Sequence, residues 1–516
     1  MTVAHAFSVA LVGLEGRPVE VEVMIGGGLP RTVLVGLPDT ALYEARDRCK
    51  AAIASSGLEW PRSLVTINLS PASLPKAGTH YDLAIAAAVL SAAGSVRGVR
   101  LNETVFLGEV GLDGRVRPVR GILPAVLAAA LRGFARAVVP AELAAEARLV
   151  ADVEVCGVST LAQLVAVLDG EPLPEQPQVV ERSEVVADEP AQPKDLRDVA
   201  GQLEARWALE VAAAGRHHLH FHGPPGVGKT MLAERLPGLL PELTPAEALQ
   251  VSAVHSLAGI GLAGLVRRAP YAAPHHSASV ASVIGGGARL ARPGLISVAH
   301  RGVLFLDEAA EFPPKVLDGL RTPLELGEVT IGRSEVQARF PADFQLVLAS
   351  NPCPCGMAST PGAVCTCNPM AIRRYAERVS GPIRDRIDIS QLLVPMKKSY
   401  LRQALRTAAE PSAVVAARVA EARARQAARL AGTGWVTNAE VSGSHLRTQL
   451  PLPAGLELVD TAVARGRLSP RGVDRVLRLS WTVADLAGRD RPSADDLVAA
   501  LGLRRGEAAG RRELAS

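Results

Sequence analysis

The sequence predicts an α/β protein with several domains, and three observations lead to this prediction. A glycine-rich loop of phosphate-binding type lies between a short alternating segment and a helical pattern. Two continuous apolar runs follow it, and each ends in polar residues, as strands of a parallel sheet buried on both faces do. The chain has 516 residues, of which 48% are hydrophobic, so it can form about three domains with sizeable cores.

The composition excludes several other classes of protein. No run approaches the ~18 uninterrupted apolar residues of a membrane span, and we see no secretory signal. Six cysteines in so long a chain do not indicate a disulfide scaffold. We therefore expect a cytoplasmic protein with no membrane partner. The net charge of +4 does not by itself indicate nucleic acid, because 49 of the 56 basic residues are arginine, as a GC-rich coding bias produces.

A proline-rich acidic stretch, 171–198, divides the chain. It contains five Pro and no aromatic residue, which is typical of an extended linker. We therefore expect a first domain at 1–170 and a longer part after the linker.

The phosphate loop begins the longer part. A helix is expected at 203–213, a strand at 218–222 and a second helix from Met231. The intervening loop has the complete G-x-x-x-x-G-K-T spacing, in which backbone N–H groups converge on phosphate oxygens. Lys229 would neutralise the β- and γ-phosphates of ATP, and Thr230 would bind Mg²⁺. The alternative is a Gly-Pro surface turn. The nucleotide-binding candidates are Gly223, Pro224, Pro225, Gly226, Val227, Gly228, Lys229 and Thr230.

Two later strands supply the other polar residues of a hydrolytic site. The run 302–306 ends at Asp307 and Glu308. Asp307 can contact Mg²⁺, and Glu308 can polarise the attacking water. The alternative is a pair of ordinary surface acids. The run 344–350 ends at Asn351, whose amide can orient that water against the γ-phosphate.

Four of the six cysteines form two C-x-C pairs separated by nine residues. Two such pairs can hold a tetrahedral Zn²⁺ through four thiolates, and a cytoplasmic location argues against two disulfides. The alternative is four reduced thiols without a metal. The candidate zinc ligands are Cys353, Cys355, Cys365 and Cys367.

The order of these motifs resembles the AAA+ ATPases, and more narrowly the magnesium-chelatase-like ComM/YifB group. The resemblance extends from about Phe7 to Leu501 and implies an AAA+ core at 199–395 and a helical lid at 396–516. The motifs that carry it are the phosphate loop, F-L-D-E at 305–308, S-N at 350–351, G-P-I-R-D-R-I-D at 381–388, S-P-R-G at 469–472, A-P-H-H-S at 273–277, and the N-terminal segments 35–39, 67–71 and 74–78.

This resemblance implies a ring, typically a homo-hexamer, with each nucleotide at a subunit boundary. Asn351 would then be the sensor-1 residue, Arg386 the arginine finger offered to a neighbouring subunit, and Arg471 the sensor-2 arginine. The alternative for Arg386 is an ion pair within the chain, with Asp385 or Asp388.

The N-terminal domain, by the same resemblance, looks like the proteolytic domain of Lon. The Lon nucleophile position is occupied by His80 and the base position by Leu123, and neither residue can form part of a Ser–Lys pair. Lys76 falls at a turn position. The resemblance thus implies a Lon-like α/β fold without peptidase chemistry.

The resemblance also implies an ATP-driven motor on single-stranded or branched DNA, with branch migration or helicase activity during natural transformation and recombination. The alternatives are the motor subunit of a magnesium chelatase, an ATP-dependent Lon-like protease and a non-catalytic scaffold. The hairpin pattern at 328–340 would face the ring pore, where Arg333 and Arg339 would contact DNA phosphates or instead pair with Glu328 or Glu335.

Two other polar features have simpler interpretations. The pair His275-His276 is expected in a polar loop near the pore rather than in a metal site. A helix at 415–430 carries four arginines, which would form a solvated face or, alternatively, contact DNA. These four are Arg418, Arg423, Arg425 and Arg429.

Overall fold

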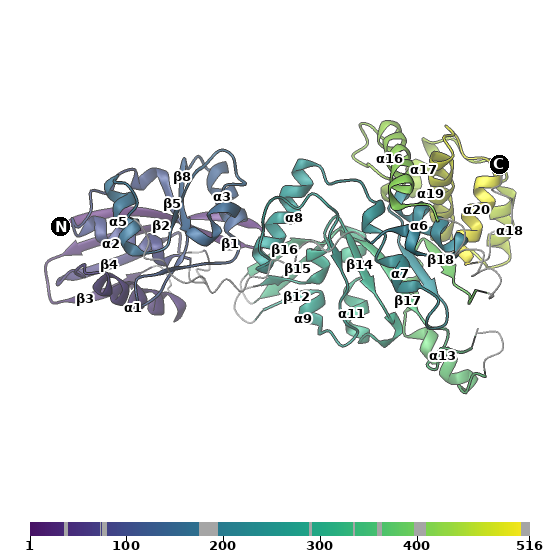
Figure 1. Cartoon of the computed structure of the whole chain (residues 1–516), viewed down its shortest axis with the longest axis horizontal. Helices are drawn as coiled ribbons and strands as arrows, with labels where there is room; N and C mark the ends of the chain where they lie inside the picture. The colour runs from purple at the N-terminus through teal and green to yellow at the C-terminus, as the bar shows by residue number, and fades with distance from the viewer. Residues whose placement is uncertain are drawn as a thin grey trace.

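The structure is a computed structural model of the whole chain, which is elongated (Figure 1). It describes residues 1–35, 40–72, 74, 80–174, 194–287, 291–333, 336–358, 364–396 and 409–506. The N-terminal part lies at one end, a second α/β part lies in the middle, and a group of helices lies at the other end. In the described ranges, no helix is both long and apolar enough to cross a membrane.

The N-terminal part is built on a seven-stranded mixed sheet in the order β3-β4-β2-β1-β5-β8-β9. Its strands are β1 (Thr2–Val12), β2 (Glu15–Gly26), β3 (Arg31–Val35), β4 (Leu64–Ser70), β5 (Thr104–Phe106), β8 (Arg136–Pro140) and β9 (Glu154–Val158), and a small ribbon joins β6 (Glu109–Val110) to β7 (Val116–Arg117). Its helices are α1 (Thr40–Ser55), α2 (Asp82–Ala92), α3 (Ile122–Leu131), α4 (Ala144–Ala147) and α5 (Leu161–Asp169).

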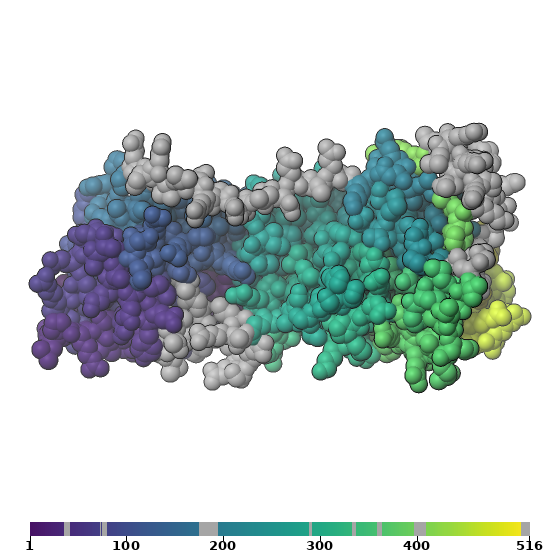
Figure 2. All heavy atoms as spheres, turned by 60° about the horizontal axis from the view of Figure 1, so that its bottom comes forward, coloured from purple at the N-terminus to yellow at the C-terminus, as the bar shows by residue number. Residues whose placement is uncertain are grey.

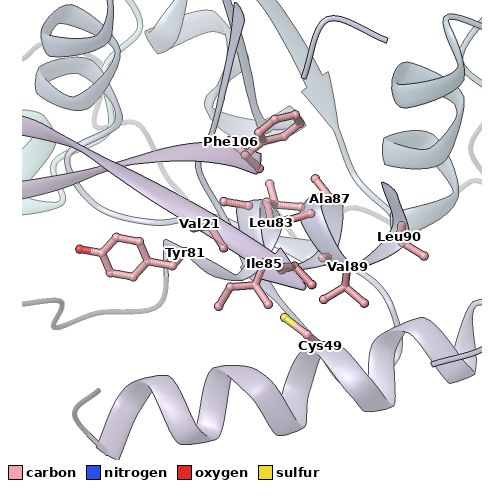
Figure 3. Close-up of a cluster of buried hydrophobic side chains, with 14 of the residues drawn as sticks. Val21, Cys49, Tyr81, Leu83, Ile85, Ala87, Val89, Leu90 and Phe106 are labelled. Carbon is pink, nitrogen blue, oxygen red and sulfur yellow. The ribbon is translucent and has the colours of Figure 1, made fainter. Parts of the chain in front are cut away.

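Alternating strand side chains give this sheet two cores, one on each face. Val105 packs with α3 and α4, whereas Phe106 packs with α1, α2 and α5. Helix α2 is apolar on every side, so it is enclosed between β2 and α1. Figure 3 shows Val21 of β2 and Cys49 of α1 directed towards the α2 side chains. Cys49 is fully buried.

The middle part contains a five-stranded sheet in the order β11-β14-β17-β10-β18, in which every neighbouring pair is parallel. Its strands are β10 (Leu219–His222), β11 (Tyr271–Ala272), β14 (Val303–Leu306), β17 (Gln345–Ser350) and β18 (Ile389–Leu392), and two hairpins join β12 (Gly285–Gly286) to β13 (Arg292–Pro293) and β15 (Glu328–Arg333) to β16 (Val336–Pro341). The helices are α6 (Leu203–Gly215), α7 (Lys229–Ala233), α8 (Pro245–Ala258), α9 (Val280–Val283), α10 (Leu295–Val298), α11 (Pro314–Gly319), α12 (Pro323–Leu326), α13 (Pro369–Glu377) and α14 (Gly381–Arg386).

The C-terminal part is helical and shares a core with α6 and one face of the parallel sheet. Its helices are α16 (Ser412–Arg429), α17 (Gly443–Thr448), α18 (Glu457–Ala464), α19 (Pro470–Leu486) and α20 (Ala494–Arg505). The expected solvated face of α16 is wrong for three of its four arginines, because Arg418, Arg423 and Arg429 bond to groups of α6 and α19. Arg425 is exposed.

Among the described residues, the N-terminal part contacts the middle part at α8 and at the hairpin of β15 and β16. At α8, the Gly121 N–H donates to the Ser256 carbonyl over 3.1 Å, and Leu249 packs against the N-terminal core. At the hairpin, the turn between β1 and β2 lies so close to β16 that a Cβ on Gly13 would be 2.4 Å from the Arg339 carbonyl oxygen. Figure 2 shows the N-terminal part, in purple and blue, directly beside the teal middle part.

Candidate active site

The sheet order brings the predicted polar residues together. Strands β14, β17 and β10 are adjacent and parallel, so the residues that follow them lie at one edge of the sheet. The phosphate loop follows β10, Asp307 follows β14 and Asn351 follows β17. Gly226 and Gly228 have φ angles of +79° and +95°, and a Cβ on either would meet no atom within 4 Å. Their open side leaves the loop backbone accessible to a phosphate.

Lys229 is the first residue of α7, and its side chain reaches Asn351 at the end of the neighbouring strand, β17. Its Nζ donates to the carbonyl oxygens of Gly223 at 2.6 Å and Pro224 at 2.9 Å, and to Asn351 Oδ1 at 3.0 Å. Burial lowers the pKa of Lys229, although the nearby carboxylates of Asp307 and Glu308 act in the opposite direction. Lys229 is thus hydrogen-bonded both to the predicted phosphate loop and to Asn351, the predicted water-orienting residue.

The two predicted magnesium ligands are in direct contact. The Thr230 hydroxyl donates to Asp307 Oδ2 over 2.7 Å. A hydroxyl and a carboxylate oxygen are ligands that Mg²⁺ prefers, and both are polar atoms at the mouth of the phosphate loop. The residues present therefore fit a Mg²⁺ ion bound with a nucleotide.

Glu308 adopts a left-handed backbone conformation, with φ of 51°, and its N–H donates to Asp307 Oδ1 over 2.9 Å. Its carboxylate faces the loop that follows β11, where His276 Nδ1 lies 3.3 Å from Glu308 Oε2. These two residues were not predicted to lie together. The signal that could have connected them is strand order, because β11 is the parallel neighbour of β14 and the residues after both strands share one edge.

The predicted arginines lie on two helices, Arg386 at the end of α14 in the middle part and Arg471 at the start of α19 in the C-terminal part. Arg386 forms an ion pair within the chain, which is the alternative to a finger that the sequence left open. Its partner is Glu325 of α12 rather than Asp385 or Asp388. The reason is that Asp385 lies 3.6 Å from Arg471 and Asp388 pairs with an arginine of α19. Arg386 is 13% exposed, whereas Arg471 is 70% exposed at the start of α19.

The four cysteines converge as the spacing predicts. Their sulfur atoms all lie within 4.8 Å of one another, and three of the Sγ–Sγ distances are 3.3, 3.6 and 3.7 Å. Four thiolates bound to Zn²⁺ at about 2.3 Å would be roughly 3.8 Å apart, so the donor set and its spacing fit zinc.

The remaining predicted positions are placed as follows. Leu123 is fully buried, and its N–H lies 3.4 Å from Glu146 Oε1. His80 has its pKa lowered to about 4 by burial. Lys76 and the side chain of Arg333 lie outside the described part of the chain. Arg339 is exposed, and its side chain makes no hydrogen bond or ion pair with any described residue, Glu328 included.

This arrangement of a phosphate loop, an acidic strand end and a polar strand end defines a P-loop nucleotide-binding protein. Comparison with known proteins specifies the class. Residues 195–401 match the family described as magnesium chelatase, subunit ChlI, residues 21–143 match subunit ChlI of Mg-chelatase, and residues 409–504 match the ChlI C-terminal family.

Three relatives align over nearly their whole length. The chain is 51% identical to an uncharacterised protein of Mycobacterium tuberculosis, over 98% of this chain and 99% of the relative. It is 40% identical to competence protein ComM of Haemophilus influenzae, over 98% of each chain. It is 38% identical to YifB of Escherichia coli, over 95% of this chain and 94% of the relative. The chain therefore belongs to the ComM/YifB family of magnesium-chelatase-like AAA+ proteins, and this membership supports an ATPase that uses ATP and Mg²⁺.

Proposed function

We propose that the protein is a hexameric AAA+ motor that hydrolyses ATP and acts on single-stranded or branched DNA, with branch migration or helicase activity during natural transformation and recombination. The observation that carries the proposal is a pair of contacts at one end of the parallel sheet, Lys229 with Asn351 and Thr230 with Asp307. They bring the residues proposed to bind phosphate, water and Mg²⁺ close together. The similarity over nearly the full length to a competence protein, ComM, supports a role in competence, and DNA is the substrate we propose for that role.

In this proposal each residue has one role. Lys229 binds the β- and γ-phosphates, and Thr230 and Asp307 hold Mg²⁺, which supplies positive charge against the phosphates when bound. Glu308 accepts a proton from the attacking water, and Asn351 orients that water. Arg386 of one subunit reaches the nucleotide of its neighbour, and Arg471 contacts the nucleotide from the C-terminal helices, which act as a lid.

We also propose a role for each part of the chain. Residues 1–170 form a Lon-like domain for assembly or binding, 171–198 a linker, 199–395 the AAA+ core and 396–516 the lid. The four cysteines hold a structural Zn²⁺. The alternative of a Lon-like protease is disfavoured because Leu123 is an apolar, fully buried residue at the base position. A magnesium-chelatase motor subunit remains the second candidate, favoured by the family match.

The test is the ATPase rate with and without branched, single-stranded and duplex DNA, for the wild type and for Glu308→Gln. We expect DNA to stimulate the wild type, and the variant to bind ATP but turn over 10²- to 10⁴-fold more slowly, because an amide cannot accept the proton. Near-wild-type turnover by the variant would contradict the role of Glu308. A wild type that neither binds DNA nor responds to it would favour the chelatase candidate.

A further inference from the structure

The cysteine cluster lies against the phosphate loop. Gly356, in the turn that contains Cys355, is buried and has a φ of +78°. A Cβ at this position would lie 2.7 Å from the Cδ atom of Pro225, which is the third residue of the phosphate loop. Proline is a rigid ring, so the close approach requires glycine at 356 and fixes the distance between the two loops.

The same cluster begins close in the chain to Asn351, the proposed water-orienting residue. Cys353 comes two residues after Asn351, is fully buried and accepts a hydrogen bond from the Ala358 N–H over 3.3 Å. The Gly356 N–H donates to the Cys353 carbonyl over 2.9 Å, which closes the turn. The four thiolates therefore shape a segment that starts at Asn351 and ends against Pro225.

Lys229 provides a second contact between the phosphate loop and Asn351. It donates to Asn351 on one side and to Gly223 and Pro224 of the phosphate loop on the other. We infer that metal binding by the cysteine cluster positions the phosphate loop and Asn351, so that zinc occupancy sets the affinity of the protein for ATP. This inference rests on the proposed zinc site and the proposed ATP site, but not on DNA binding.

ATP should in turn affect the affinity of the protein for zinc. If zinc strengthens ATP binding by some factor, ATP must strengthen zinc binding by the same factor, because the two bind one chain and the coupling is thermodynamic. Couplings of this kind are typically between about fivefold and 150-fold. A cluster that only stabilised its own loop would give no coupling in either direction.

The experiment uses the full-length protein and measures the equilibrium Kd of a fluorescent ATP analogue, before and after zinc is removed with a chelator and after Zn²⁺ is restored. We expect removal to weaken binding about tenfold and restoration to reverse the loss. Cys367→Ser should behave like the zinc-free protein. Its matched control is Cys156→Ser, a half-buried cysteine of the N-terminal part that should change neither zinc content nor Kd.

A second variant separates the loop contact from the metal. Gly356→Ala keeps all four thiolates, so it should retain one Zn²⁺ per chain while binding ATP more weakly, because the methyl group displaces Pro225. Gly57→Ala is the control, since Gly57 has a φ of +77° but nothing within 4 Å of a Cβ. Zinc affinity, measured by competition with a metallochromic chelator, should rise about tenfold when ATP is present.

Three results would overturn the inference: equal ATP affinity with and without zinc in a protein that stays folded by circular dichroism, wild-type affinity in Gly356→Ala, or no effect of ATP on zinc affinity. Absence of bound zinc after expression with excess Zn²⁺ would overturn both this inference and the zinc site. Failure of the DNA proposal would leave all these measurements unchanged, because none of them contains DNA.

Discussion

Asp388→Asn should loosen the C-terminal helices from the parallel sheet. Asp388 precedes β18, is 2% exposed and forms an ion pair with Arg475 of α19. Its Oδ2 also accepts the His218 N–H over 2.9 Å, at the residue before β10. The Asp388 carboxylate therefore connects β10, which leads to the phosphate loop, with α19, the helix that contains Arg471.

The expected cost follows from burial. Arg475 is 15% exposed, so removing the charge of Asp388 leaves a guanidinium largely out of water without its counter-charge. Breaking a buried pair in this way costs about 3–5 kcal/mol, and the partial exposure of Arg475 places this pair near ~3 kcal/mol. Replacing both partners, in Asp388→Asn with Arg475→Met, should recover much of the loss because no unpaired charge remains.

Native-state hydrogen exchange of the α19 amides measures this free energy locally, which suits a chain of several parts that does not unfold in two states. A loss of ~3 kcal/mol raises exchange about 100-fold or more. Asp474→Asn is the control on the same helix, because its pair with Arg447 is more exposed and should contribute under about 1 kcal/mol. Less than a fivefold increase for Asp388→Asn, or no recovery in the double variant, would refute the reasoning.

The pair also predicts a pH dependence. Burial alone would raise the pKa of Asp388, but the Arg475 guanidinium and the neighbouring imidazoles hold it well below its usual range. A depressed carboxyl pKa stabilises the fold at any pH above the unfolded value of about 3.9, and the stabilisation is lost as the pH falls through the folded value. The α19 protection of the wild type should therefore decrease below about pH 4, and that of Asp388→Asn should decrease less over the same range.

Two further predictions concern assembly and DNA. If Arg386 acts on a neighbouring subunit, Arg386→Ala and Lys229→Ala proteins should each be inactive but should regain ATPase activity when mixed; no recovery in a demonstrably mixed ring would exclude the role. Arg333→Ala with Arg339→Ala should weaken DNA binding and reduce the slope of log K against log salt by up to about two, while basal ATPase activity survives. An unchanged salt slope would place the DNA contacts elsewhere.

The middle part was the most predictable from sequence, because its strands are short apolar runs that each end in a chemically distinctive residue. The expected strands 218–222, 302–306 and 344–350 correspond to β10, β14 and β17 within one residue at each end. The expected hairpin is also confirmed, as β15 and β16. Because these strands are parallel neighbours, the candidate residues that follow them lie close together, and the sequence motifs are enough to predict this.

What the sequence could not reveal were the contacts between loops and helices distant in the chain. Arg386 pairs with Glu325, which precedes it by 61 residues, rather than with the acids beside it. Asp385 lies on the same short helix as Arg386 and Asp388 lies just beyond its end, and packing determines which acid the arginine meets. Likewise, the contacts of His276 with Glu308 and of Gly356 with Pro225 depend on which strands are adjacent.

The arginines of α16 bear on where DNA would bind. Arg418 forms a bidentate pair with Glu210 of α6, and Arg429 forms one with Asp485 of α19 while lying 4.3 Å from the Trp481 ring centroid. The Arg423 guanidinium donates twice to the Ala213 carbonyl, and burial lowers its pKa to about 10.

To contact a phosphate, each of these side chains would first have to break hydrogen bonds within the fold and leave a carbonyl or carboxylate unpaired. Leaving such a buried group unsatisfied costs about 1–3 kcal/mol, which offsets most of what one phosphate contact would contribute. The Arg339 side chain is exposed and bonds to no described residue, and Glu335, its other expected partner, lies outside the described residues. Of the arginines considered for DNA, Arg339 is therefore better suited than these three to bind a phosphate, and its backbone rests against the turn at Gly13. A phosphate bound at Arg339 would lie beside both the hairpin and the N-terminal part of the chain.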